Sequence, residues 1–143
     1  MPIYLKYGDI KGDVTDSAHA GYIELTSGQW GVGRGVKTPT SGSADREGAA
    51  PSVSEITVTK TSDSTSSRLF TESVRGQPKV DAVVDFVRND PDDQSVYLRL
   101  EMSETMISSW TISGSGGPDT ATEALALNFK KIEFKKTPGT PPP

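Results

Sequence analysis

The chain of 143 residues contains no cysteine and a single histidine, His19. The absence of cysteine excludes disulfide bonds, thiolate metal ligands and cysteine nucleophiles. His19 stands in a turn next to alanine, with no motif that supplies a nucleophile or an orienting carboxylate, so a catalytic triad is not supported. We expect His19 to close the turn before the second strand by a side-chain hydrogen bond. The sequence predicts no catalytic residue, cofactor site or enzymatic activity.

Long hydrophobic runs are also missing. No segment approaches the ~20 apolar residues that a membrane-spanning helix needs, and the first residues, Met1-Pro-Ile-Tyr-Leu-Lys, lack the apolar core of a signal peptide. We therefore expect no membrane insertion. We also expect synthesis in the cytoplasm, so any export would follow a route that reads no cleaved N-terminal signal.

Clustered positive charge is scarce as well. The chain carries 15 basic and 19 acidic residues, a net charge of -4, and most basic residues are scattered, which argues against nucleic-acid binding. The densest basic group is expected to be the solvated edge of a strand, protected against aggregation: Lys130, Lys131, Lys135 and Lys136.

The acidic cluster does not predict a metal site. Asp90, Asp92 and Asp93 lack the spacing and the distal glutamate of an EF-hand, so the pattern favours a solvated turn over a calcium site.

Short alternating apolar runs are present, and they are typical of antiparallel sheets with one wet face. One short helix of about ten to twelve residues is predicted, with Ser62, Asp63 or Ser64 as its N-cap and Gly76 at its end. The patterns indicate a mainly β single domain, an antiparallel β-sandwich or small barrel. The predicted strands lie near residues 3–8, 21–31, 53–60, 79–88, 95–102, 105–114 and 122–136.

The last strand contains a break in its alternation. Leu125, Leu127 and Phe129 share one face, whereas Ile132 and Phe134 fall on the opposite parity. One extra residue must be absorbed between them, which predicts a β-bulge near Lys130 and Lys131.

Residues 31–52 are rich in glycine, serine and proline and are predicted to form no regular element. A connection of about twenty residues is well beyond the usual four to six, and loops of that length are usually functional or disordered.

Several segments, in this order, resemble the Hcp family, the haemolysin-coregulated tube proteins of bacterial type VI secretion. The first are Ile3-Tyr-Leu-Lys-Tyr-Gly-Asp-Ile-Lys-Gly-Asp13, His19-Ala-Gly-Tyr-Ile-Glu-Leu25 and Gln29-Trp-Gly-Val-Gly-Arg-Gly35. The ending, from Met106-Ile-Ser-Ser-Trp through Ser-Gly-Ser-Gly-Gly to Leu127-Asn-Phe-Lys-Lys-Ile132, completes the resemblance. It implies hexameric rings that stack into a tube and carry or chaperone effectors, with a spike protein and a contractile sheath as partners and final delivery outside the bacterium or into a target cell.

The resemblance also implies where contacts are made. The long loop is expected to reach the next ring, Gln29 is expected to face the lumen and contact effectors, and residues 1–137 form the tube domain, followed by a flexible proline-rich tail at 138–143. The ring-stacking candidates are the charged residues of the loop: Arg34, Lys37, Asp45, Arg46 and Glu47.

An alternative from another class is a monomeric β-sandwich that binds a carbohydrate or another small ligand. Its stacking surface would be built from Trp30, Trp110 and Tyr97. The mass of the particle in solution distinguishes a ring from this binding module.

Overall fold

The computed structural model describes residues 1–34, 36–37, 47–48, 50–90 and 95–137. The predicted mainly β class is confirmed, with one α-helix, α1 (Ser66–Arg75), in the described part of the chain. The strands are β1 (Ile3–Tyr7), β2 (Ile23–Leu25), β3 (Ser27–Gln29), β4 (Val32–Gly33), β5 (Val36–Lys37), β6 (Glu47–Gly48), β7 (Ser52–Val53), β8 (Ile56–Thr61), β9 (Val80–Val87), β10 (Val96–Ser113), β11 (Thr122–Asn128) and β12 (Lys131–Lys136).

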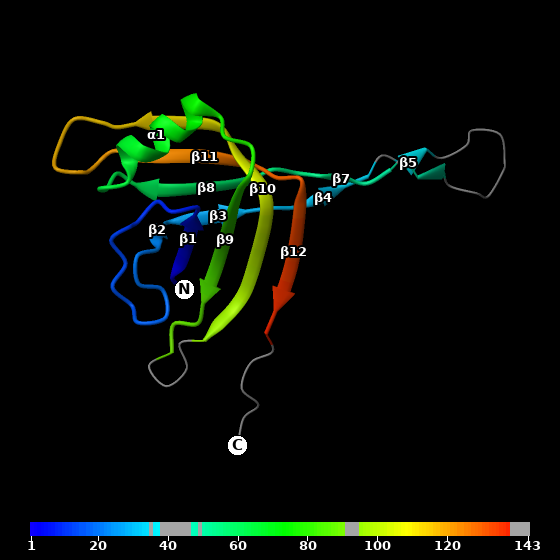
Figure 1. Cartoon of the computed structure of the whole chain (residues 1–143), viewed down its shortest axis with the longest axis horizontal. Helices are drawn as coiled ribbons and strands as arrows, with labels where there is room; N and C mark the ends of the chain where they lie inside the picture. The colour runs from blue at the N-terminus through cyan, green and yellow to red at the C-terminus, as the bar shows by residue number, and fades with distance from the viewer. Residues whose placement is uncertain (35, 38–46, 49, 91–94, 138–143) are drawn as a thin grey trace, which may run out of the picture.

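The main sheet is antiparallel and curls into a small barrel (Figure 1). Its strands follow the order β2-β1-β9-β10-β11-β8-β3, with β12 also paired to β10. The two ends of this order, β2 and β3, are consecutive in the chain and are separated only by Thr26, whose backbone N–H donates to the carbonyl of Thr59 at 2.8 Å. One short segment therefore joins the two ends of the sheet, which explains why a chain with few apolar residues can enclose a single core.

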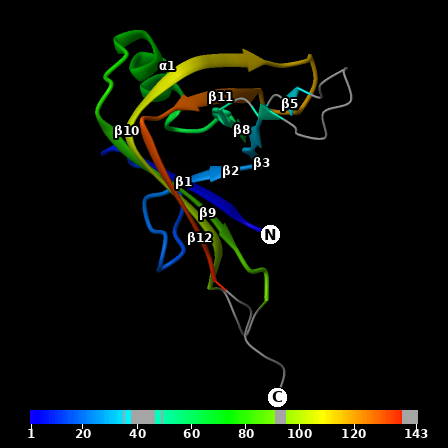
Figure 2. The ribbon, with the colours of Figure 1, turned by 90° about the vertical axis from the view of Figure 1, so that its right-hand side faces the viewer.

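Strand β10 belongs to both halves of the barrel (Figure 2). Residues 98–103 pair with β12 and residues 106–113 pair with β11. The two strands predicted at 95–102 and 105–114 are thus one strand of 18 residues. A register shift between Met102 and Thr105, with Glu104 at a φ of +50°, bends the strand without ending it.

The β-bulge predicted near Lys130 and Lys131 is wrong. The chain leaves β11 at Asn128 and enters β12 at Lys131, so the alternation changes at a corner between two strands. β11 packs along the C-terminal half of β10 and β12 along its N-terminal half. A change of parity has the same appearance in the sequence whether one strand bulges or two strands meet at a corner.

Helix α1 has ten residues, as predicted, and ends at Gly76, whose left-handed φ of +63° lets its N–H reach the carbonyl of Glu72. The predicted N-cap is wrong: Thr65 holds that position, and Asp63 contributes by accepting the Thr65 N–H at 2.8 Å. The helix buries Leu69 against the core. No helix of the described residues is long and apolar enough to cross a membrane.

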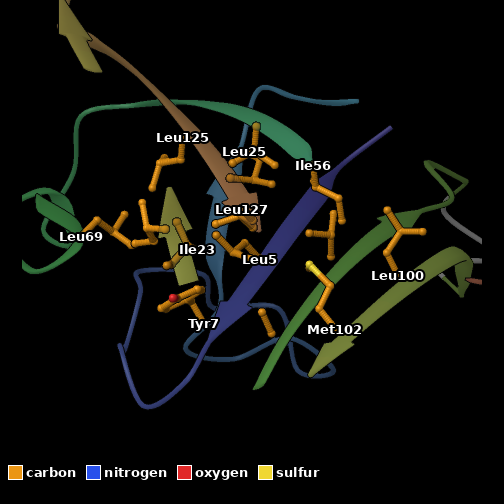
Figure 3. Close-up of a cluster of buried hydrophobic side chains, with 14 of the residues drawn as sticks. Leu5, Tyr7, Ile23, Leu25, Ile56, Leu69, Leu100, Met102, Leu125 and Leu127 are labelled. Carbon is orange, nitrogen blue, oxygen red and sulfur yellow. The ribbon is translucent and has the colours of Figure 1, made fainter. Parts of the chain in front are cut away.

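The core lies inside the barrel and is contributed by strands far apart in the sequence (Figure 3). Leu5, Ile23, Ile56, Leu125 and Leu127 are each at most 1% exposed. Burying such a side chain contributes about 1.5–3 kcal/mol to stability. The alternate residues of these strands face outward, and they form the surfaces described next.

Candidate functional site

The outer face of the sheet β3-β8-β11-β10 is lined with small, uncharged side chains. In one cross-strand row Gln29 pairs with Thr57, Thr57 with Ala126, and Ala126 with Ser109. The next row runs in the same way from Ser27 through Thr59, Ala124 and Thr111. We call this surface the hydroxyl face, defined by those two rows and by Thr61, Thr122 and Ser113.

The hydroxyl face carries no charged side chain at the strand positions that the structure describes. Glu55, which comes just before β8, accepts a hydrogen bond from the Ser108 hydroxyl at the edge of this face. Hydroxyl groups can donate and accept, whereas the alanines offer only methyl groups. The face can therefore contact another protein without presenting it a charge.

The charges of these same strands are turned inward. Lys60 of β8 and Glu123 of β11 are fully buried and joined by a salt bridge of 3.1 Å. The Trp110 indole N–H donates to Glu123 at 2.9 Å, and the Ser66 hydroxyl at the start of α1 donates to it as well. Burial raises the pKa of Glu123, but the hydrogen bonds from Ser66, Trp110 and Lys60 outweigh it and hold this pKa below its ordinary value.

Gln29 lies at the exposed end of β3, next to the arm formed by the paired strands β4 and β7 and the paired strands β5 and β6 (Figure 1). The prediction that residues 31–52 form no regular element is wrong, because β4 pairs with β7 and β5 pairs with β6 as two short antiparallel ladders. The arm projects away from the barrel, with Val32 opposite Val53 and both side chains about half exposed.

Only part of the predicted loop site can be placed. Arg34 is exposed, and Lys37 of β5 pairs with Glu47 of β6 in the backbone register. Asp45 and Arg46 lie outside the described residues. The arm thus carries Arg34 and sets Lys37 opposite Glu47 in the backbone ladder.

The aromatic surface required for a ligand-binding module is not formed. Trp30 stacks on Phe134 with ring centroids 6.1 Å apart, whereas Trp110 packs against Phe70 at 5.2 Å. Tyr97 instead lies beneath the cationic groups of Arg88 and Lys136. Since the three predicted rings have separate neighbours, they do not combine into one stacking platform.

His19 has partners that the sequence analysis missed. Its Nε2 lies 2.9 Å from the buried carboxylate of Asp85, and its Nδ1 lies 3.0 Å from Asp16 in the same turn. Arg99 donates two hydrogen bonds to Asp85, at 2.7 and 2.8 Å, which raise the pKa of the Arg99 guanidinium. The contact with Asp16 is the expected turn closure, and Asp85 fastens that turn to the outside of the barrel.

The more distant carboxylate partner of His19 could not be identified from local sequence. Asp85 lies 66 residues away from His19, and it reads as an ordinary outward position of an alternating strand. The rings of Tyr4 and Tyr22 pack against the imidazole of His19, with centroids 4.9 and 4.8 Å away, and complete this cluster.

Comparison with known proteins identifies a family and relatives that match this chain. The family described as "Type VI secretion system effector, Hcp" matches residues 4–135. The curated protein hcp1 of Pseudomonas aeruginosa is 28% identical over 138 residues, which cover 96% of this chain and 84% of that protein.

Solved structures show the same fold. One described as a type six secretion system protein superposes with a TM-score of 0.87 at 25% identity, covering 97% of this chain and 85% of that chain. Hcp1 from Salmonella typhimurium superposes with a TM-score of 0.75 at 22% identity, covering 94% of this chain and 85% of that chain. A chain of the PVC sheath-tube complex, from an extracellular contractile injection system, superposes with a TM-score of 0.64 at 13% identity. The match covers 94% of this chain and 88% of that chain.

Proposed function

The chain belongs to the Hcp family of type VI secretion tube proteins, and we propose that it forms hexameric rings that stack into the inner tube and carry or chaperone effectors. The function is mechanical, and we propose no enzymatic activity. The observation that carries the proposal is the arrangement of the hydroxyl face between two unpaired sheet edges.

Those edges lie on opposite sides of the hydroxyl face. β3 pairs only with β8, and residues 106–113 of β10 pair only with β11 within the described residues. An unpaired edge of this kind is an aggregation hazard unless it is covered or used. Pairing β3 of one copy with β10 of the next gives a head-to-tail contact, which closes into a ring when the rotation between copies allows it.

Such a ring continues the sheet from one copy to the next and turns one face of it toward the channel. We propose that the hydroxyl face lines this lumen and that Gln29 contacts effectors there. A neutral, small-residue wall suits a conduit, because a charged wall would hold cargo of opposite sign and exclude cargo of like sign.

The arm is the proposed contact between stacked rings. It stands away from the barrel with a pair of half-exposed valines at its base, and it carries Arg34, Lys37 and Glu47. Asp45 and Arg46 complete the proposed set of stacking residues. A charged hairpin that extends beyond its own domain is well placed to reach a neighbouring subunit.

The remaining partners follow from family membership. We propose that a spike protein caps the tube, that a contractile sheath surrounds and propels it, and that the protein leaves the bacterial cytoplasm for the extracellular space or a target cell without a signal peptide. We also propose that residues 1–137 are the tube domain and residues 138–143 a separate tail.

Ring formation is tested by native mass spectrometry and negative-stain electron microscopy of the purified chain. The expected particle has six times the subunit mass of 15.2 kDa and an annular projection. A particle that stays monomeric across concentrations contradicts the proposal.

The lumen assignment is tested with Gln29→Arg. Rings of wild type and variant are isolated from cells that express the secretion system, and the proteins that co-purify are quantified by mass spectrometry. Six new positive charges in the channel should change which effectors are retained, holding acidic ones and excluding basic ones, while Thr71→Arg on the exposed side of α1 should not. Equal retention by all three proteins would exclude Gln29 as an effector contact.

A further inference from the structure

Besides the edges at β3 and β10, the sheet has a further free edge at strand β12, which the proposed ring closure does not use. It pairs with residues 98–103 of β10 on one side, and no strand of the described residues pairs with its other side. Figure 2, which views the molecule from the right-hand side of Figure 1, shows β12 on the near side of the sheet. Backbone N–H and C=O groups along such an edge can accept an added strand.

Two hollows flank this edge. An apolar pocket of about 290 Å³ lies between β3 and β12, and its lining includes Trp30, Phe86, Leu98 and Phe134. A second pocket of about 190 Å³ touches Ile132 at the start of β12. Phe134 is 51% exposed although it borders the apolar pocket, so one face of an added strand would cover apolar surface there.

One residue of the pocket lining has an unused hydrogen-bond donor. The Trp30 indole N–H is buried and has no partner in the part of the chain that the structure describes. A buried donor without an acceptor is costly, and native proteins rarely leave one unpaired. A carbonyl group of a segment bound beside Trp30 could supply the missing acceptor after a small rotation of the ring.

The charges beside this edge specify the partner further. Residues 130–136 hold four lysines and one glutamate on a chain whose net charge is -4. Along β12, Ile132 and Phe134 alternate with Lys131, Glu133 and Lys135. Lys135 also contacts Glu101 at 3.1 Å, an exposed pair that contributes little and can be exchanged. The edge is thus basic on one face and apolar on the other.

We propose that the β12 edge binds an extended, acidic segment of a partner protein by strand addition. Apolar side chains of that segment enter the pocket beside Phe134, and its carboxylates meet Lys131 and Lys135. The alternation of an added strand matches the alternation of β12, so one register satisfies both faces. The Trp30 indole N–H donates to a carbonyl of the bound segment.

The probe is a fluorescein-labelled peptide, Glu-Leu-Ser-Leu-Glu, blocked at its C-terminus. Because its sequence reads the same in both directions, it can place leucines beside Ile132 and Phe134 and serine beside Glu133 in either orientation. Binding to the intact, assembled protein is followed by fluorescence anisotropy. The controls are Lys-Leu-Ser-Leu-Lys, which reverses the charge, and Leu-Leu-Ser-Glu-Glu, which removes the alternation.

We expect the acidic alternating peptide to bind at least about tenfold more tightly than either control peptide. Phe134→Ala should weaken binding about tenfold or more, while Phe70→Ala, which removes a ring of similar exposure on α1, should leave it within about twofold. Lys131→Glu should weaken binding, and Lys79→Glu, at an exposed position outside β12, should not.

The indole N–H signals of the two tryptophans give a reading that does not depend on any variant. Peptide binding should shift the Trp30 signal and leave that of Trp110, which already donates to Glu123, in place. No binding at millimolar peptide, equal binding of the three peptides, or an unmoved Trp30 signal would overturn the proposal. Failure of ring formation would leave these measurements unaffected, because they concern a different edge.

Discussion

Removing the buried ammonium of Lys60 tests how this barrel keeps charge off the hydroxyl face. Lys60→Met preserves much of the side-chain length and apolar volume. It removes the hydrogen bonds that the ammonium donates to Glu123 at 3.1 Å, to Asp63 at 2.9 Å and to the carbonyl of Thr61 at 3.0 Å. The Glu123 carboxylate then remains buried without a positively charged partner.

The expected loss in the free energy of unfolding depends on the polar groups that stay buried after the substitution. Breaking a buried ion pair by removing one partner costs about 3–5 kcal/mol. Glu123 keeps its donors Ser66 and Trp110, so we expect the lower end, about 3 kcal/mol. For a domain of 143 residues this corresponds to a Tm lowered by about 10 °C.

The assay is urea unfolding followed by tryptophan fluorescence and circular dichroism, at one fixed protein concentration because assembly adds to apparent stability. Lys79→Met, at an exposed position, is the matched control and should change little. In a double-mutant cycle with Glu123→Gln, the two single costs should sum to more than the double cost. A cost below about 1 kcal/mol for Lys60→Met, or full additivity in the cycle, would refute the reasoning.

The same pair determines a dependence on pH. The pKa of Glu123 in the folded protein is below its ordinary value of 4.5, so the folded state favours the carboxylate. Its stabilising contribution is complete above about pH 4.5 and is lost as the pH falls through the lower folded pKa. In Lys60→Met the carboxylate has lost its ammonium, so the difference from wild type should shrink on acidification.

Three further predictions concern other parts of the molecule. Asp85→Asn should cost about 2–3 kcal/mol, since it removes the charge that meets His19 and Arg99, while Asp81→Asn on the same strand is exposed and should be near neutral in thermal unfolding. Glu104, at a φ of +50°, should accept glycine without loss, whereas Glu104→Val should cost about 1–2 kcal/mol by chemical denaturation. Stacking of rings that each carry -24, six times -4, should increase as salt shortens the screening length below about 8 Å, and light scattering that does not change with ionic strength would contradict this.

The sequence by itself determined the class of the fold and most of its elements. Period-two alternation identified the strands around Leu5, Ile56, Val84 and Leu125, because each side chain there faces either core or solvent. Gly76 marked the end of the helix, since a left-handed residue is needed there. The ordered segments also carried the resemblance to the family, which the comparisons bear out.

Tertiary structure alone decided which residues meet. The sequence could not show that Lys60 and Glu123 pair inside the barrel, or that His19 reaches Asp85, because such contacts join residues more than sixty positions apart. It could not distinguish a bulge from a corner at Lys130, since both shift the alternation by one residue. Long-range pairing also leaves β12 with a free edge beside an apolar pocket, and no local pattern records which edges of a sheet remain unpaired.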